Sequence, residues 1–576
     1  MKDNGFPWPP PGLLGIFRNE SISPLSKSPQ IFKTMNRSLV AGPVCPESLF
    51  WMQHIEMGGC TPPQVDVVIV GAGASGLACA RRLALSRRRI RILLVEGRER
   101  VGGRSLTVPC LGVGTVDLGG QWIGPNQPLA LELVQTLGLS ASVVRQTWFV
   151  DDSKNSSGLI AGASSLTREE QSVFDKLVAD VSERSRGVRG PPLDDVWTFE
   201  GSLEGAAALD SLSAADFLEQ HPICRSYGFF TDTTQVLSQS VRREFGLLIQ
   251  TSVACDPKQL SFLAFLFFVK ACGGLKAVGD GDGGAQTFKL EGGAMQLWDL
   301  GSSELKRLFG VDVQKQTDVT AITIASGREA DQFPIELRSG EACICTTRAL
   351  VVAFSPMLWR RVKWHPSIMP STKAALAARL VGGRAVKVIV VFSTAFWDTS
   401  PANGPAHSHE RPLLEDCGPI ANLFPSTVGP YPALIGLITA QAATEFGALP
   451  SEASKRAAVL AQLEAFFGNG AASKPLEVMI MDWQAQKLSG GCFAAFLPPA
   501  TVGIGTQTAH VTLESPVDLT GPNGCGVGRV AFASTELAAS WPSYFEGALD
   551  AGYRAADKVG SWLDTHPVSR DARSRL

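Results

Sequence analysis

Three glycines with the spacing Gly71-x-Gly73-x-x-Gly76 directly follow the apolar, β-branched run Val65–Val70. Between a strand and a helix, such glycines form a tight turn, let a pyrophosphate contact the backbone and let the helix pack closely on the strand. The phosphates then lie at the helix N-terminus. Glu96 stands 20 residues after Gly76, at the end of the apolar run IRILLVE, where an acid can bind a ribose hydroxyl. An acid there disfavours a 2′-phosphate, so the pattern predicts a dinucleotide site with NAD and FAD both open.

A second glycine-rich turn follows, in which Arg98 and Arg104 flank the pair Gly102-Gly103, and the segment VDLGGQWIGPNQ comes soon after it. Glycines allow close approach of the backbone, and guanidinium groups bind phosphate oxygens in bidentate geometry. The alternative is an ordinary surface turn with a solvated Arg104. The density of apolar residues and glycines around the turn favours a second phosphate-binding element.

Two isolated side chains could also do chemistry. Cys492 follows two glycines in the stretch SGGCF, so a flat molecule could lie against a backbone that carries no side chains. Lys387 lies inside the apolar run AVKVIVV, where a lysine is costly to bury unless it is partnered or neutral. The competing interpretations are a buried inert cysteine and a strand-edge lysine that reaches solvent.

Length and composition limit the class of protein. A chain of 576 residues can form two or more hydrophobic cores, and a net charge of −2 gives no sign of nucleic-acid binding. The 12 cysteines include no CxxC pair, which favours free thiols in a reducing compartment. His407-Ser408-His409 has no further ligands nearby, so we expect no metal site. The run Leu260–Val269 is too short to span a membrane and predicts a buried helix.

Five longer segments carry a resemblance to a known family. They are FLFFVKACGG, LEGGAMQL, LVGGRAVKVIVVFSTAFW, DWQAQKLSGGCFAAFLPP and GRVAFASTELAASWPSYFEGALDAGYRAA. With these segments the chain resembles the flavin-containing amine oxidases from about Val65 to about Val559, and SGGC makes it most similar to their monoamine oxidase branch. The resemblance implies an α/β fold, α+β overall, with a Rossmann-type FAD-binding domain and an interleaved substrate-binding domain of mixed sheet and helices.

The domain ranges expected from this resemblance are discontinuous. The FAD-binding domain is assigned to 65–142, 285–375 and 486–562, and the substrate-binding domain to 143–284 and 376–485. Residues 1–64 are expected to be a disordered extension, and residues 563–576 a polar tail.

The resemblance also implies roles for single residues. In monoamine oxidases the cysteine of SGGC forms a thioether to the 8α carbon of FAD, which we expect of Cys492. A lysine of the family holds a water near flavin N5, and Lys387 matches it. Two aromatic rings flank the amine, and Phe493 and Tyr544 match them; a ring face can contact a cationic amine. The family usually has Tyr at the position of Phe493, so this chain keeps the ring and loses a hydroxyl.

Four positions match the family's substrate cavity. Gln286 falls on a cavity glutamine, a lone polar group that suits substrate orientation. Thr251, Ser252 and Gly279 fall where the family has larger and more apolar residues, which puts the substrate preference in question. The positions expected to bind FAD are Gly71, Ala72, Gly73, Ser75, Gly76, Glu96, Arg98, Gly102, Gly103, Arg104, Gly120, Gln121, Trp122, Val319, Cys492, Ser534, Glu536, Tyr544 and Phe545. Ser534 replaces the glycine of the usual FAGTE.

The expected function is therefore FAD-dependent oxidative deamination of primary amines by O2, giving aldehyde, ammonia and hydrogen peroxide. The alternatives are a polyamine or L-amino-acid oxidase on the same fold and a flavin-binding scaffold without turnover. We expect an amine and O2 as small-molecule partners, no nucleic acid and no membrane anchor, with a homodimer left open. An intracellular, soluble protein is favoured, and the compartment is not assigned.

Overall fold

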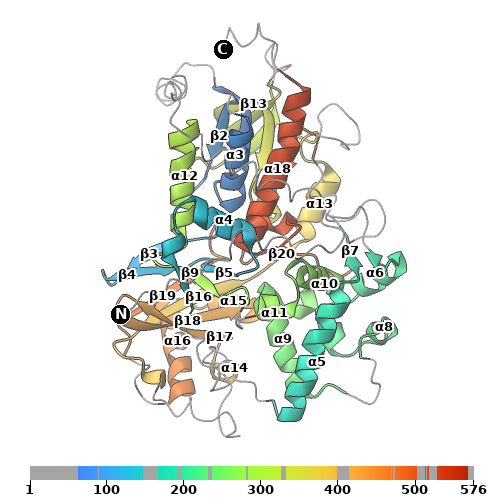
Figure 1. The fold of residues 1–576 in the computed structure, drawn as a ribbon, viewed down its shortest axis with the longest axis vertical. Coiled ribbons are helices and arrows are strands. Elements are labelled where there is room, and N and C mark those ends of the chain that lie inside the picture. Colours follow the sequence, from blue (N-terminus) through green and yellow to red (C-terminus); the bar gives the residue numbers. More distant parts are fainter. Residues whose placement is uncertain are drawn as a thin grey trace.

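The computed structural model describes residues 62–567 with several gaps. Outside the description lie residues 1–61, 88–89, 147–165, 191–197, 231–235, 280–282, 326–332, 399–413, 469, 471, 473, 503–512, 514–515, 518–527 and 568–576. Almost all of the predicted N-terminal extension, most of the polar tail and the pair His407 and His409 are among them. The described chain forms one large sheet in the upper half of Figure 1, with a second sheet and a group of helices in the lower half.

The large sheet has the strand order β10-β2-β1-β13-β12-β11-β14, with β21 also paired to β13. Its strands are β1 (Gln64–Val70), β2 (Ile92–Val95), β10 (Val313–Gln314), β11 (Ala321–Ile324), β12 (Ile335–Ser339), β13 (Ala342–Val352), β14 (Lys363–Trp364) and β21 (Val530–Phe532). β1 runs parallel to both of its neighbours, β2 and β13. The continuous apolar run in β1 follows from this position, because a central parallel strand is buried on both faces.

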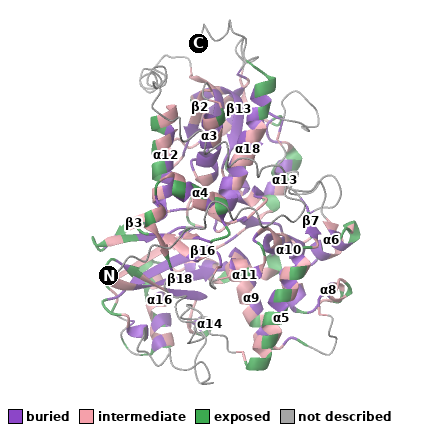
Figure 2. Ribbon diagram, in the orientation of Figure 1, coloured by how far each residue is buried: buried purple, intermediate pink, exposed green. Residues whose placement is uncertain are grey.

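The two faces of β1 belong to different cores. Val67 and Ile69 contact the core under the helices α3 (Ala74–Ser86), α4 (Pro128–Thr136), α12 (Met295–Phe309) and α18 (Phe545–Thr565). Val68 and Val70 contact the core on the opposite face, which includes η7 (Pro356–Arg361) and α13 (Ser371–Arg379). Figure 2 shows the resulting buried interior between β13 and the helices α3 and α18.

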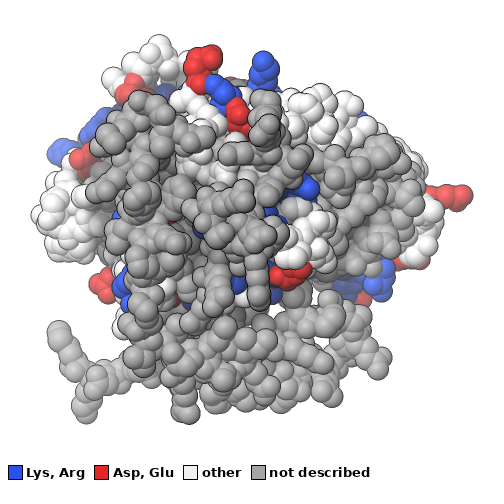
Figure 3. Space-filling view, turned by 90° about the horizontal axis from the view of Figure 1, so that it is seen from above, with Lys and Arg blue, Asp and Glu red and all other residues white. Residues whose placement is uncertain are grey.

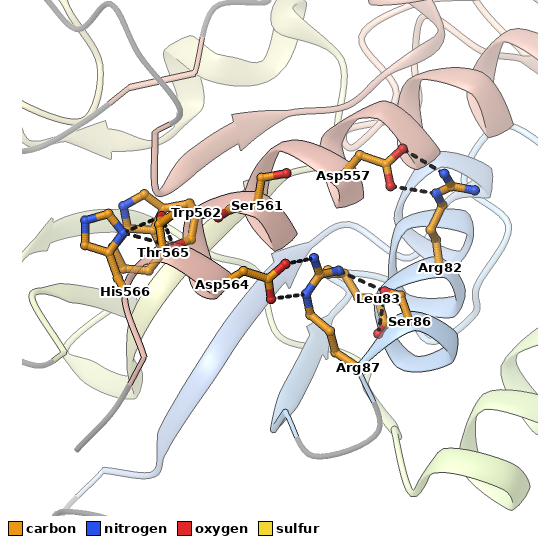
Figure 4. A network of polar contacts seen from close by, with 10 residues as sticks. All are labelled: Arg82, Leu83, Ser86, Arg87, Asp557, Ser561, Trp562, Asp564, Thr565 and His566. Carbon is orange, nitrogen blue, oxygen red and sulfur yellow. Dashed lines mark hydrogen bonds and ion pairs between the residues drawn. The ribbon is translucent and has the colours of Figure 1, made fainter. Parts of the chain in front are cut away.

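The helices α3 and α18 lie directly against one another. A Cβ at Gly552 would lie 2.3 Å from the Ser75 carbonyl oxygen, so only glycine permits this approach. At the outer ends, Arg82 donates two hydrogen bonds to Asp557 at 2.7 and 2.8 Å. Arg87 donates two to Asp564, at 3.1 and 2.6 Å (Figure 4). A C-terminal helix thereby holds the helix that follows the glycine turn.

The second sheet is antiparallel, with the order β17-β18-β16-β19. Its strands are β16 (Ala385–Val391), β17 (Asn422–Val428), β18 (Tyr431–Thr439) and β19 (Glu477–Asp482). Val386, Val388 and Val390 point into a core with α15 (Ala440–Gly447) and α16 (Glu452–Phe467). Because strand residues alternate between faces, Lys387 points to the opposite face, where its contacts are Gly119, Gln121 and Trp122.

The helices of the lower right in Figure 1 enclose a fourth core. They are α5 (Arg168–Ser185), α6 (Leu203–Asp210), α7 (Ala214–Leu218), α8 (Pro222–Ser226), α9 (Gln239–Val253), α10 (Phe262–Ala271) and α11 (Leu275–Val278). The amphipathic stretch predicted from the sequence forms α5, which begins with a capping box between Thr167 and Glu170. The predicted apolar helix is α10, and seven of its ten residues are buried.

Short strands link these regions. β5 (Trp122–Ile123) and β6 (Val143–Arg145) both pair with β9 (Phe288–Leu290), and β15 (Val381–Gly382) pairs with β20 (Ala495–Phe496). β3 (Thr107–Cys110) pairs with β4 (Gly114–Asp117), and β7 (Val188–Arg189) with β8 (Thr198–Phe199). The predicted α/β fold, with a Rossmann-type unit and a separate mixed region, is confirmed. The residue limits of the two domains stay a prediction.

Surface and helix properties agree with the composition. On the face in Figure 3, the described basic and acidic side chains are mixed around the rim rather than gathered in one patch. Among the described residues, no helix is long and apolar enough to cross a membrane. Within the same residues, no group of three or more His, Cys, Asp or Glu side chains is placed to bind a metal.

Candidate active site

A cavity of about 470 Å³ lies where the large sheet meets the second sheet and the helix α9. Its lining comes from segments that are far apart in the sequence: the glycine turn after β1, the SGGCF loop, the strands β16 and β17, and the start of α18. Every site residue predicted from the sequence lines this cavity except Ala72, Gly76 and Glu536. These three lie directly behind the lining.

The glycine turn has the form that a pyrophosphate site requires. Gly71 has a φ of +104°, and a Cβ there would lie 2.7 Å from the Ala353 carbonyl oxygen. Gly73 and Gly103 face one another, and a Cβ at Gly103 would lie 3.3 Å from the Cα of Gly73. A Cβ at Gly76 would lie 1.9 Å from the Gly71 carbonyl oxygen. The two glycine-rich turns therefore form one bare backbone cradle at the N-terminus of α3, which fits a dinucleotide.

Glu96 connects this cradle to the next turn. Its Oε2 accepts a hydrogen bond from the Ala72 backbone N–H, and its Oε1 accepts one from the Arg98 backbone N–H, both at 2.9 Å. The Arg98 guanidinium donates to Ser489 Oγ at 2.9 Å, so it reaches the SGGCF loop. Burial lowers the pKa of Arg98, and the Glu96 carboxylate opposes that effect.

Arg104 lines the cavity beside the cradle and forms an ion pair with a buried carboxylate. It donates to Glu536 at 2.9 and 3.2 Å and to the Phe493 carbonyl oxygen at 2.6 Å. Ser355 Oγ donates to the same carboxylate at 2.8 Å. Burial disfavours the carboxylate of Glu536, but the Arg104 charge and these hydrogen bonds outweigh it and lower its pKa. The guanidinium thus joins the glycine-rich turn to the segment after β21 and to the SGGCF loop.

Lys387 does not reach solvent, because only 4% of its surface is exposed. Its Nζ donates to the Gly119 carbonyl oxygen at 3.0 Å and to Gln121 Oε1, and it lies 5.1 Å from the centroid of the Trp122 ring. Burial lowers the pKa of Lys387 to about 8, against the opposing charge of Asp117. The amine is therefore poised to lose its charge within the cavity.

Cys492 is buried at the edge of the cavity, held by backbone contacts. Its N–H donates to the Gly383 carbonyl oxygen at 2.9 Å, and a Cβ at Gly491, which has a φ of +133°, would lie 2.6 Å from that oxygen. Gly491 is thus required by the loop itself, in addition to leaving room for a flat ligand. Burial raises the pKa of the Cys492 thiol to about 11, while Arg104 and Lys387 act in the opposite direction.

The predicted substrate residues lie on the cavity wall in different polar states. Thr251 and Ser252 donate their hydroxyls to carbonyls of their own helix α9, at 2.9 and 2.7 Å. Gln286 has a buried Oε1 with no hydrogen-bond partner among the described residues. Ser534 is buried on the cavity wall, and its Oγ likewise has no partner in the described part of the chain.

Sequence reasoning missed several residues of the site. Asn422 and Leu437 line the cavity, and Trp483 donates to the Leu118 carbonyl oxygen at 2.9 Å. Ser489 accepts a hydrogen bond from Arg98, and Ser355 donates one to the Glu536 carboxylate. Asn422 had a usable signal, since it is the polar residue that precedes the apolar residues of β17. The serines carry no such signal, because their role depends on which loops meet in space.

The glycine cradle at the first βαβ unit opens into a cavity with a buried lysine and aromatic side chains. This arrangement is typical of an enzyme that uses a dinucleotide cofactor to act on a small molecule. The chain belongs to the flavin containing amine oxidoreductase family, whose family model matches residues 74–560. This membership implies FAD, and the bare cradle and the large cavity fit it.

The chain is also similar to individual proteins of known name or structure. The chain is 29% identical to the flavin-containing amine oxidase A of Sus scrofa over 88% of this chain and 87% of that protein. It is 29% identical to the human flavin-containing amine oxidase B over 86% of each. The structure of cyclohexylamine oxidase from Brevibacterium oxydans is similar with a TM-score of 0.66 and 25% identity, covering 87% of this chain and all of that one. Putrescine oxidase bound to putrescine, 19% identical with a TM-score of 0.66 over 87% of this chain and 99% of that one, shows the shared fold alone.

Proposed function

We propose that this protein oxidises primary amines with O2 to aldehyde, ammonia and hydrogen peroxide, with FAD attached to Cys492. The observation that carries the proposal is that Cys492, Phe493, Lys387 and Tyr544 all line the same cavity as the glycine cradle. These four come from three separate parts of the sequence. Each matches a position for which the flavin-containing monoamine oxidases have a defined role.

Bound FAD would supply the two-electron oxidation of the amine and the transfer of those electrons to O2. The cradle of Gly71, Gly73 and Gly103 would admit its pyrophosphate, and Ser534 would donate a hydrogen bond to it. Phe493 and Tyr544 would bracket the amine in front of the redox ring. The apolar wall would lower the pKa of the amine by desolvation, so that it is present in the neutral, oxidisable form.

The buried lysine would act on water rather than on the substrate directly. Lys387 already donates to the Gly119 carbonyl oxygen and to Gln121, so its position is held by two acceptors and by the Trp122 ring. Burial lowers the pKa of Lys387 to about 8, which makes loss of its proton easier than for an exposed lysine. It is therefore suited to holding a water molecule and passing a proton to or from it.

The test is to purify the protein and precipitate it with acid. Yellow colour that stays with the pellet reports a covalent flavin, and Cys492→Ala should release it. Cys343→Ala is the control, because Cys343 lies on β13 outside the cavity. Peroxide release with benzylamine, tyramine or serotonin tests the oxidase. Bound flavin without turnover of any amine would favour a scaffold, and colour that leaves the wild-type pellet would refute the attachment at Cys492.

A further inference from the structure

A buried amide oxygen that has no hydrogen-bond partner among the described residues lies on the cavity wall some distance from Lys387. Asn422 is only 8% exposed and lines the cavity, and its Oδ1 is buried without a hydrogen bond to any described residue. Gln286, on the same cavity, has the same property at Oε1. An unpaired polar group in the interior is unfavourable, and such groups usually find a protein or ligand partner.

The protein satisfies a buried amide elsewhere in the same region. Gln462, fully buried on α16, donates to the carbonyl oxygens of Leu414 and Ile420 and accepts from the Ile420 N–H, at 2.7 to 2.9 Å. Gln127 and Gln146 are other buried amides with unpaired atoms, but neither lines the cavity. Asn422 and Gln286 therefore stand out because a molecule in the cavity could reach them.

The register of the second sheet places Asn422 relative to the reaction centre. Asn422 lies opposite Leu437 on β18, and Leu437 lies opposite Lys387 on β16. Residues directly opposite one another share a face, and all three line the cavity. Neighbouring strands are about 4.8 Å apart, so the Cα of Asn422 lies about 10 Å from that of Lys387. Asn422 is thus offset from Lys387 along the cavity wall by two strand spacings.

The wall between these two residues is apolar. Leu437 lies between them, and Phe424, two residues after Asn422 on the same face, packs against Trp122 with ring centroids 5.5 Å apart. A substrate with an apolar middle is favoured by this wall, whereas its far end meets an amide. An amine with an apolar tail would exclude water from that amide and leave it without a hydrogen bond, whereas a polar tail would form one with it.

We propose that the preferred substrates are amines whose end remote from the reacting nitrogen carries a hydrogen-bonding group, a hydroxyl or a second amine, which binds the Asn422 amide with Gln286 as the second polar contact. The inference rests on the proposed amine oxidation at this site. It makes Asn422 a specificity-determining residue, since the amide touches the tail of the substrate and not the reacting carbon.

The experiment compares matched amines with and without the polar tail. kcat/KM is measured for tyramine against phenethylamine, and for 6-amino-1-hexanol and 1,6-diaminohexane against hexylamine. In the wild-type protein, kcat/KM for the polar amine of at least one pair should exceed kcat/KM for its apolar partner by about tenfold, the effect of one buried hydrogen bond to a substrate. In Asn422→Leu the ratio should fall to near one, mainly through a higher KM for the polar amine. The hydroxyl and diamine pairs separate the two kinds of tail.

The matched control is Asn126→Leu, the same substitution at an exposed asparagine outside the cavity lining, which should keep the wild-type ratio. Asn422→Ala repeats the test with a smaller side chain, and the flavin absorbance of each variant reports an intact site. Ratios near one in the wild-type protein, or a preference that survives both Asn422 substitutions, would overturn the inference.

If no amine is oxidised, the proposed function is refuted, but the inference about Asn422 can still be tested by binding. The dissociation constants of the same pairs, from flavin absorbance titrations, then decide the inference. Tighter binding of the polar member that depends on Asn422 supports it, and equal binding overturns it.

Discussion

Replacing Glu536 by Gln should destabilise the protein far more than the same substitution at an exposed ion pair. The side chain of Glu536 is 2% exposed, and that of its partner Arg104 is 25% exposed. The carboxylate accepts two hydrogen bonds from Arg104 and one from Ser355. Glutamine keeps the shape but removes the charge and turns one acceptor into a donor, which faces a guanidinium that has lost its counter-ion.

The magnitude follows from the burial of the pair. Breaking a buried ion pair by removing one partner costs about 3–5 kcal/mol, because the remaining charge is left uncompensated. An unfolding entropy of roughly 2.1 cal/mol/K per residue over the roughly 420 described residues gives about 0.9 kcal/mol/K, so Tm should fall by about 3–6 °C. The double variant Arg104→Met with Glu536→Leu removes both charges, so it should lose less than Glu536→Gln alone.

The assay is thermal unfolding of the flavin-loaded protein, followed by circular dichroism. Glu183→Gln is the matched control: Glu183 and Arg186 form an ion pair whose side chains are 68% and 74% exposed. Exposed pairs contribute about 0–1 kcal/mol, so the control should shift Tm by under about 1 °C. Equal shifts for Glu536→Gln and Glu183→Gln, or a double variant that loses the sum of its single losses, would refute the reasoning.

Two further predictions concern the cradle and the lysine. Gly76→Ala places a Cβ 1.9 Å from the Gly71 carbonyl oxygen, so it should force the helix α3 away from β1 and lower flavin content and Tm together; an unchanged flavin-to-protein absorbance ratio would contradict this. Lys387, with its pKa lowered to about 8 by burial, loses its proton in the folded protein before the unfolded chain does. Its contribution to the free energy of unfolding should therefore rise by up to about 3 kcal/mol from pH 8 to 10.5. Urea unfolding of wild type and Lys387→Met across that range measures it, and parallel pH profiles would contradict it.

Much of the fold could be predicted because local patterns and global packing agree in the first βαβ unit. The apolar run before Gly71, the glycine spacing and the helical repeat after it each need only neighbouring residues to be recognised. The helices α5 and α10 could also be predicted from the sequence, α5 from its amphipathic pattern and α10 from its long apolar run. The sheet order could not be read in this way, since β21 joins β13 from a segment about 180 residues later in the chain.

The site was predictable where a residue's type is unusual for its surroundings. A lysine inside AVKVIVV and a cysteine after two glycines are both conspicuous, and both line the cavity. The expected role of Glu536 in binding the cofactor stays a prediction; its carboxylate pairs with Arg104 across more than 400 residues, a contact that no local pattern indicates. Asn422 carries a weak signal as the polar first residue of β17, but the importance of its amide follows from its burial and from its Oδ1, which has no hydrogen-bond partner among the described residues.

The arrangement of the thiol and the amine is set by one short piece of backbone. Cys492 is hydrogen-bonded to Gly383, and Lys387 lies four residues further along the same segment, at the third position of β16. Gly383 in turn admits no side chain, because a Cβ there would lie within 3 Å of backbone atoms of Cys492, Phe493 and Val253. A shift of the second sheet against the large sheet would therefore move the sulfur and the amine together, while changing their distance from the glycine cradle. Asn422 belongs to the same sheet, because Lys387 on β16 lies opposite Leu437 on β18, which lies opposite Asn422 on β17. The second sheet therefore positions both Lys387 and the Asn422 amide.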